Sequence, residues 1–455
     1  MTPAYLLTSH GTFLYHDVGT NQLRHGTRPG AAHETALIQD GQTCWLAHRA
    51  QDEWQRLDGL SPNGEIGWAD PDGAPLTFYA RELGEGLIGL EANGYCLCAE
   101  SDGRVTLSRQ IRGPWETFIA INEAGMDRLD TLRDDRFLLA SRDVPVHITL
   151  QPEFRASAGP LGIPLNTLLT ARPWGDGAGF TLRYQGWKID QLIRFRPLIY
   201  LLAYGPQEMF DCLELALRSL WEFGRYDGEV LIFSDRGADQ MYAFVPDELK
   251  ARTRVVTAPA RDVLDIMAVK YRIADVPGAD AYRPLVYLDT DVICNRPVLP
   301  MLTELLQSHH VSLPLEHDFH APDDFYGANL LAEDDIARRR DPRGMCAGLI
   351  GIPGIAAAER CFPAILDSLY ARARALGTRE PSPWLDQPAA NYVLRKTGAV
   401  DCTIMTARVV TPVDTTQPAA AIPRLGFAHF SGGVGDAVRK LPLMRAYLEL
   451  LRQTP

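Results

Sequence analysis

Two aspartates stand two residues apart at the end of an apolar run, in the segment Leu285-Val286-Tyr287-Leu288-Asp289-Thr290-Asp291. In an extended chain, residues i and i+2 point to the same side, so both carboxylates can face one ligand. Two hard oxygen donors suit Mg²⁺ or Mn²⁺, and such a cation can hold a diphosphate. The same spacing occurs at Asp70-Pro71-Asp72-Gly73, where proline and glycine indicate a turn. The surrounding elements must therefore distinguish the two pairs.

The pattern from residue 195 to residue 455 predicts an α/β domain around the first pair. Residues 197–203 are almost all apolar, as expected for a strand that is buried on both faces. Helical spacing at 210–223 and 261–275 alternates with strands at 229–233 and 254–256, which predicts a mostly parallel sheet. Ligands bind beyond the carboxyl ends of such strands. Asp289 and Asp291 lie at such an end, and the turn at Asp70 does not.

Residues 1–124 are predicted to be all-β, with short alternating segments between turns. Phe13, Trp54 and Tyr95 recur at steps of 41 residues, and three such repeats must pack around a shared axis. This arithmetic predicts a β-trefoil. The third repeat, at residues 93–118, resembles the fascin-like type of trefoil repeat. Residues 125–194 are interpreted as a connecting segment of mixed structure.

Five segments, in this order along the chain, resemble the GT-A fold glycosyltransferases related to family 8, the glycogenin and bacterial galactosyltransferase type. The resemblance covers about residues 197–450. The segments are 267–272, 287–291, 345–351, 384–392 and 427–433. The resemblance implies transfer of a sugar, with retention, from a nucleotide-sugar donor, most simply a UDP-sugar. It leaves a glycan, a lipid-linked sugar or a protein side chain open as the acceptor, with 316–345 as the acceptor loop.

The resemblance also implies a set of metal ligands. Asp289 and Asp291 would be the DxD ligands, and His429 would be the third. Imidazole beside two carboxylates suits Mn²⁺ better than Mg²⁺. Packing alone is the alternative explanation for His429, which stands in an apolar Phe-Ala-His-Phe segment.

Further positions would contact the donor. Lys270 would reach its diphosphate or sugar, unless it is an ordinary surface lysine. Asp386 would bind sugar hydroxyls or cap the following helix, and Gln387 would lie near the anomeric carbon. The remaining donor contacts implied are Ala203 and Tyr204 at the nucleobase, Cys346 and Gly348 at the sugar, and Gly432 and Gly433 at a phosphate.

Two positions depart from the family pattern. Cys346 stands where the family has an asparagine, whose amide it cannot replace. Gly435 stands where the family has a lysine, which leaves Arg439 and Lys440 as substitutes at the diphosphate. These departures support a rival interpretation as a non-catalytic sugar- or nucleotide-binding protein. A sugar nucleotidyltransferase is a weaker rival, because Tyr204-Gly205-Pro206-Gln207-Glu208 lacks the basic loop expected after its first strand.

Composition limits the partners and the compartment. The net charge of −12 argues against nucleic-acid binding, which needs a basic surface. No apolar run approaches the ~20 residues of a membrane span. Eight scattered cysteines without a CxxC pair are typical of a reduced, cytoplasmic protein. Peripheral docking at the inner face of a membrane is left open.

Overall fold

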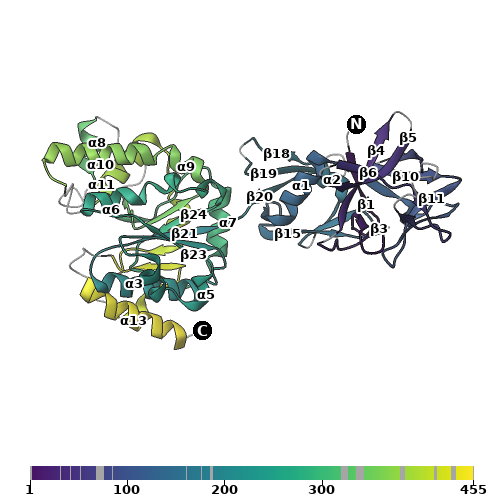
Figure 1. Cartoon of the computed structure of the whole chain (residues 1–455). Helices are drawn as coiled ribbons and strands as arrows, with labels where there is room; N and C mark the ends of the chain where they lie inside the picture. The colour runs from purple at the N-terminus through teal and green to yellow at the C-terminus, as the bar shows by residue number, and fades with distance from the viewer. Residues whose placement is uncertain are drawn as a thin grey trace. The chain divides into compact units, whose positions relative to one another are not determined.

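The computed structural model divides the chain into two compact units, Met1–Arg194 and Phe195–Pro455. Each unit is described by itself (Figure 1). The structure describes residues 3–30, 32–40, 43–51, 53–67, 76–84, 86–159, 161–175, 177–184, 188–318, 326–334, 343–379, 385–413, 418–431 and 437–453. No helix in these ranges is long and apolar enough to cross a membrane.

The first unit begins with six antiparallel strands that close into a ring. In ring order they are β1 (Pro3–Thr8), β4 (His33–Asp40), β5 (Thr43–Ala50), β9 (Phe78–Gly84), β10 (Leu87–Ala92) and β13 (Phe118–Asn122). Leu46, Phe78, Leu90 and Phe118 are buried together in its core. Shorter strands lie between the ring strands: β2 (Leu14–Asp17), β3 (Gln22–His25), β6 (Glu53–Arg56), β7 (Gly59–Leu60), β8 (Ile66–Gly67), β11 (Tyr95–Ala99) and β12 (Val105–Arg109). The predicted β structure is present, and its assignment as a trefoil stays a prediction.

The rest of the first unit is a second antiparallel sheet with two helices. The helices are α1 (Glu123–Asp134) and α2 (Leu165–Leu169). The sheet contains, in spatial order, β17 (Leu161–Pro164), β16 (Arg155–Ala158), β15 (Val144–Gln151), β14 (Arg136–Leu139), β20 (Lys188–Arg194), β19 (Gly179–Tyr184) and β18 (Arg172–Pro173). Leu129 of α1 and Phe137 of β14 share a buried core with Ile119 and Ile121 of the ring. The segment interpreted as connecting structure is therefore packed against the ring.

The second unit is built on a five-stranded sheet with helices on both faces. Its order is β23 (Thr253–Thr257), β22 (Glu229–Ser234), β21 (Leu198–Ala203), β24 (Leu285–Leu288) and β28 (Leu349–Ile352). The first four strands are parallel and β28 is antiparallel, which confirms the mostly parallel sheet. Figure 1 shows α3 (Gln207–Glu222), α5 (Asp247–Lys250) and α13 (Ala437–Gln453) below this sheet. It shows α6 (Val263–Lys270), α9 (Ile355–Glu359), α10 (Phe362–Leu376) and α11 (Gln387–Thr397) above it.

Two small sheets complete the second unit. One has the order β25 (Val292–Cys294), β30 (Phe427–His429) and β29 (Val409–Val410), and the other pairs β26 (Leu315–Asp318) with β27 (Arg343–Met345). The remaining α-helices are α4 (Ala238–Met241), α7 (Leu299–Gln307), α8 (Ala328–Glu333) and α12 (Thr403–Thr406). The register of the first small sheet places His429 opposite Val292. A segment from the end of the chain therefore lies beside Asp291.

Candidate metal centre

Backbone pairing brings three separate segments to the carboxyl end of β24. The N–H of Asp289 donates to the carbonyl of Gly348 at 2.8 Å, which extends the pairing of β24 with β28 by one residue. The N–H of Phe430 donates to the carbonyl of Asp291 at 2.9 Å. Asp289, Asp291, Gly348 and His429 are therefore held together by main-chain hydrogen bonds.

The side chains of Asp289, Asp291 and His429 converge on one point. Nε2 of His429 lies 3.3 Å from Oδ1 of Asp291 and 3.8 Å from Oδ2 of Asp289. One ligand atom from each residue lies within 4.8 Å of the other two. The structure therefore brings together the three residues that the sequence predicts as metal ligands.

In each aspartate, the carboxylate oxygen that does not face His429 accepts a hydrogen bond from a neighbouring side chain. The hydroxyl of Tyr287 donates to Oδ1 of Asp289, and Nζ of Lys440 donates to Oδ2 of Asp291. Oδ1 of Asp291 is buried and accepts no hydrogen bond from the part of the chain that the structure describes. A buried carboxylate oxygen that accepts no hydrogen bond is costly unless a cation satisfies it.

Glycine at position 348 keeps the space between the ligands open. A Cβ at this position would lie 2.5 Å from Cε1 of His429 and 2.8 Å from Oδ2 of Asp289. Two carboxylates and one imidazole around such a space fit a divalent cation, and the nitrogen donor favours Mn²⁺ over Mg²⁺.

The other ring nitrogen of His429, Nδ1, also has hydrogen-bond partners. Its Nδ1 lies 3.0 Å from Oγ1 of Thr411 and 3.4 Å from Sγ of Cys346. Because the hydroxyl of Thr411 donates to Oε1 of Glu316 at 2.5 Å, its oxygen is left to accept a proton from Nδ1. A proton held on Nδ1 would leave the lone pair of Nε2 for a cation that displaces the second proton, as in histidines that bind metals.

The electrostatics of this pocket favour a positive charge. Burial would raise the pKa of Asp291, but His429 and Lys440 outweigh it and hold that pKa well below its ordinary value. Burial would lower the pKa of His429, but Cys346 and Asp291 raise it well above its ordinary value. For Asp289 burial dominates, and its pKa is raised although Lys270 lies nearby. The paired carboxylates therefore create a field that a cation would satisfy.

A second cluster lies next to the metal ligands, around Asp386. Nζ of Lys270 lies 2.9 Å from Oδ2 of Asp386 and 3.0 Å from the carbonyl of Ala347, and the hydroxyl of Tyr271 also donates to Oδ2. Oε1 of Gln387 accepts the N–H of Ala347 at 3.1 Å. Residues 386 and 387 are thereby tied to the loop that carries Gly348.

The structure excludes the alternative explanations for two residues of this cluster. Lys270 is not a surface lysine, because it is only 2% exposed. Burial opposes its charge, but Asp386 and Asp289 outweigh burial and raise the pKa of Lys270. Asp386 does not cap α11 with its side chain, because its carboxylate is engaged by Lys270 and Tyr271. Its backbone nevertheless stands at the N-terminus of that helix.

The other predicted residues lie at the same sheet edge or outside the described residues. Ala203 ends β21, next to β24, and the hydroxyl of Tyr204 donates to the carbonyl of Ala258 at 2.7 Å. Cys346 is buried beside His429. Gly432, Gly433 and Gly435 lie outside the described residues, as do Trp384, the side chain of Arg439 and half of the acceptor loop 316–345. Their roles stay predictions.

Sequence reasoning missed the residues that hold the metal ligands and Asp386 in place. These are Glu316, Thr411, Tyr271 and Tyr287, together with Lys440 as a partner of Asp291. Lys440 stands 149 residues after Asp291, so no local spacing connects them.

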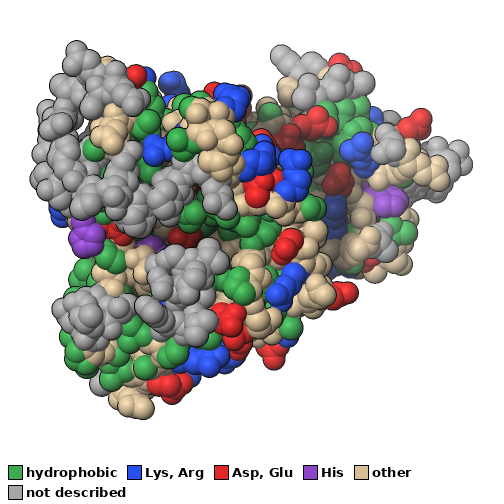
Figure 2. Space-filling view, turned by 90° about the vertical axis from the view of Figure 1, so that its left-hand side faces the viewer, with side chains coloured by type: hydrophobic (Ala, Val, Ile, Leu, Met, Phe, Trp, Pro, Cys, Tyr) green, Lys and Arg blue, Asp and Glu red, His purple; other side chains and the backbone are tan. Residues whose placement is uncertain are grey.

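Figure 2 shows acidic and histidine side chains set back in a hollow of the second unit.

Comparison with known proteins gives distant structural matches. No protein-family model and no curated protein matches the sequence. Mouse xyloside xylosyltransferase 1, in its apo form, matches 53% of this chain and 98% of its own, at 10% identity and a TM-score of 0.37. Galactosyltransferase LgtC, in complex with donor and acceptor sugar analogues, matches 55% of this chain and 95% of its own, at 13% identity and a TM-score of 0.37. At such low similarity, the residues of the site have to support any functional assignment.

Proposed function

We propose that the second unit is a metal-dependent GT-A glycosyltransferase of the family 8-like type. It would move a sugar from a nucleotide-sugar, most simply a UDP-sugar, to an acceptor, with retention at the anomeric carbon. The observation that carries the proposal is the convergence of Asp289, Asp291 and His429 beyond a parallel strand, beside Asp386 and Gln387. A carboxylate–imidazole set next to hydrogen-bonding groups suits a sugar joined to a diphosphate.

Three side chains would hold the cation. They are Asp289, through Oδ2, Asp291, through Oδ1, and His429, through Nε2. When bound, Mn²⁺ would supply positive charge against the departing nucleoside diphosphate. Tyr287, Lys440 and Thr411 would keep the three ligands oriented, since each binds the ligand through an atom other than the one facing the cation.

Asp386 and Gln387 would bind and orient the donor sugar. Lys270 and Tyr271 both bind Oδ2 of Asp386, which leaves Oδ1 to accept a hydrogen bond from a sugar hydroxyl. Gln387 uses Oε1 to accept the N–H of Ala347, which leaves its amide protons to donate near the anomeric carbon. Attack by the acceptor hydroxyl on the face that the diphosphate leaves would then give retention.

The first unit would support this activity rather than perform it. We propose that its six-stranded ring is a β-trefoil of the fascin-like type, with a structural or acceptor-positioning role. The closed ring and the hairpins β2–β3 and β11–β12 support this assignment. Seven buried cysteines are free thiols, which supports the reducing cytoplasm as the compartment.

Donor turnover tests the proposal. The full-length protein is incubated with a panel of UDP- and GDP-sugars, with Mn²⁺ or with a chelator, and release of nucleoside diphosphate is measured. We expect at least one donor to be hydrolysed or transferred only with Mn²⁺, and Asp289→Asn to abolish that turnover. The matched control is Asp275→Asn, since Asp275 is an exposed carboxylate of the same unit.

Two results would overturn the proposal. If no donor gives hydrolysis or transfer while the protein still binds UDP with Mn²⁺, the site only binds nucleotide. If the protein instead releases pyrophosphate from a nucleoside triphosphate and a sugar phosphate, it is a nucleotidyltransferase.

A further inference from the structure

Three histidines of the first unit lie together, far along the chain from the site described above. His16 is on β2, His33 on β4 and His48 on β5. His16 and His33 are direct partners in the β2–β4 pairing. His48 stands opposite Thr35 in the β4–β5 pairing, two residues from His33 and therefore on the same side of the strands. The register of three strands thus gathers side chains that no sequence motif connects.

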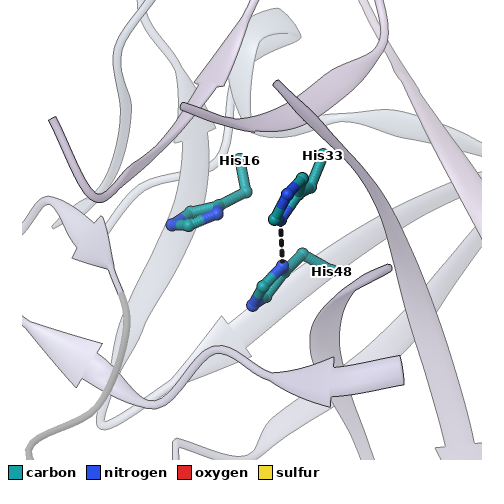
Figure 3. Close-up of side chains that lie close together, drawn as sticks. All are labelled: His16, His33 and His48. Atoms are coloured by element: carbon teal, nitrogen blue, oxygen red, sulfur yellow. Dashed lines mark hydrogen bonds between the residues drawn. The ribbon is translucent and has the colours of Figure 1, made fainter. Parts of the chain in front are cut away.

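The rings face one another closely (Figure 3). Nδ1 of His33 and Nδ1 of His48 share a hydrogen bond of 2.9 Å, in which one of the two nitrogens carries the proton. The ring centroids of His16 and His48 are 4.4 Å apart, and those of His33 and His48 are 5.0 Å apart with nearly parallel planes. One nitrogen from each ring lies within 4.8 Å of the other two.

Another histidine pair in the same unit shows a different arrangement. His10 and His25 are also stacked, with centroids 5.0 Å apart. Their Nε2 atoms, however, bind the backbone carbonyls of Ala99 and Glu100, at 2.9 and 2.6 Å. The Nε2 atoms of that pair are hydrogen-bonded to the main chain, whereas ring nitrogens of the three-histidine cluster point toward one another.

Burial keeps the cluster in the form that binds metals. His16 and His48 are only 3% and 1% exposed. Burial, followed by the neighbouring rings of His16 and His33, lowers the pKa of His48 to about 4. Burial also lowers the pKa of His16. The neutral imidazole is the state that a transition metal requires.

A neighbouring amide orients one of the rings. Nε2 of His16 lies 3.1 Å from Oδ1 of Asn21. Because an amide oxygen can only accept, Nε2 carries the proton and Nδ1 keeps the lone pair. A histidine that binds a metal usually donates its other N–H in this way.

We propose that His16, His33 and His48 form a second metal site, which takes a borderline transition cation such as Zn²⁺. When two nitrogens each lie about 2.0–2.1 Å from one cation, they are about 2.9 Å apart if the N–metal–N angle is a right angle. They are about 3.3 Å apart if that angle is tetrahedral. The 2.9 Å between Nδ1 of His33 and Nδ1 of His48 falls within this range, so a bound cation would replace the proton of their hydrogen bond. Imidazole donors select Zn²⁺, Cu²⁺ or Ni²⁺ over Mg²⁺ and Mn²⁺, so this site differs in chemistry from the carboxylate centre.

Zinc titration against a competing chelator tests the site in the full-length protein. We expect His33→Gln to remove one tight Zn²⁺ equivalent relative to wild type. His33 is chosen because it is the least buried of the three histidines, so its replacement disturbs the core least. The matched control is His147→Gln, an exposed histidine of β15, which should keep every equivalent. A Co²⁺ titration should give visible d–d absorption in wild type that His33→Gln lacks.

A second variant keeps the test independent of misfolding. Asn21 has a positive φ of 54°, so Asn21→Gly removes the amide without straining the backbone. We expect this variant to weaken Zn²⁺ binding about 10- to 100-fold, as loss of an orienting partner does. Equal Zn²⁺ stoichiometry and affinity in wild type and His33→Gln would overturn the proposal. Because Asp289 and Asp291 remain intact in every variant, this outcome is separable from failure of the carboxylate site.

Discussion

Gly348→Ala should close the carboxylate centre without removing any ligand. The new methyl carbon would lie 2.5 Å from Cε1 and 2.9 Å from Nε2 of His429, and 2.8 Å from Oδ2 of Asp289. Ordinary contacts between such atoms are about 3.5 Å, so the imidazole must move by about 1 Å. A metal site tolerates ligand displacements of only about 0.2 Å. The backbone at Gly348 lies outside the left-handed region, so steric overlap with the ligands is the direct effect of the substitution.

The expected loss is at least about 100-fold in Mn²⁺-dependent UDP binding, or about 2.8 kcal/mol, because each tenfold change is about 1.4 kcal/mol. Isothermal titration of UDP with and without Mn²⁺ measures it. Overpacking will also lower the free energy of unfolding by about 1–3 kcal/mol, so circular dichroism must first show a folded protein. Gly237→Ala is the control, since a Cβ there meets no atom within 4 Å. If folded Gly348→Ala binds UDP and Mn²⁺ as wild type does, the cation does not lie between Asp289 and His429.

Three further changes test the partners of the site. Lys270→Met should lower the free energy of unfolding by about 3–5 kcal/mol, because it leaves the carboxylate of Asp386 buried without its ammonium partner. Lys270→Met combined with Asp386→Leu should recover part of that loss in urea unfolding, and no recovery would argue against the pair. Thr411→Val preserves shape but removes the group beside Nδ1 of His429, so Mn²⁺ affinity should fall about 10- to 100-fold in the UDP titration; unchanged affinity would show that Thr411 does not orient the ring. Lys440→Met removes the donor that holds Oδ2 of Asp291, so binding of Mn²⁺ alone, measured by the loss of its free-ion EPR signal, should weaken; tighter binding would show that the positive charge of Lys440 opposes the cation more than it orients the ligand.

The sheet of the second unit was predictable because its strands are buried on both faces. The apolar runs at 197–203 and 285–288 needed no knowledge of distant contacts, and β21 and β24 lie there. The position of Asp289 at a carboxyl end follows from the same pattern. His429 could be joined to Asp289 and Asp291 only through the order of motifs along the chain.

The partners of these residues could not be predicted in the same way. The sequence left a surface position open for Lys270, because a short helix shows little about which of its sides is covered, and the structure buries it against Asp386. Thr411 reaches His429 because β29 and β30 run side by side. The cluster of His16, His33 and His48 likewise depends on the pairing of β2, β4 and β5, so its sequence spacing carries no metal-binding signal.

The most direct test of the carboxylate centre is a crystal of the full-length protein soaked with Mn²⁺ and UDP, measured at a wavelength where manganese scatters anomalously. We expect one strong anomalous peak within coordination distance of Asp289, Asp291 and Nε2 of His429, in contact with the diphosphate. Lys270 should still be bound to Asp386. Manganese and UDP bound elsewhere, with His429 still against Asp291, would rule out the carboxylate centre as the donor site.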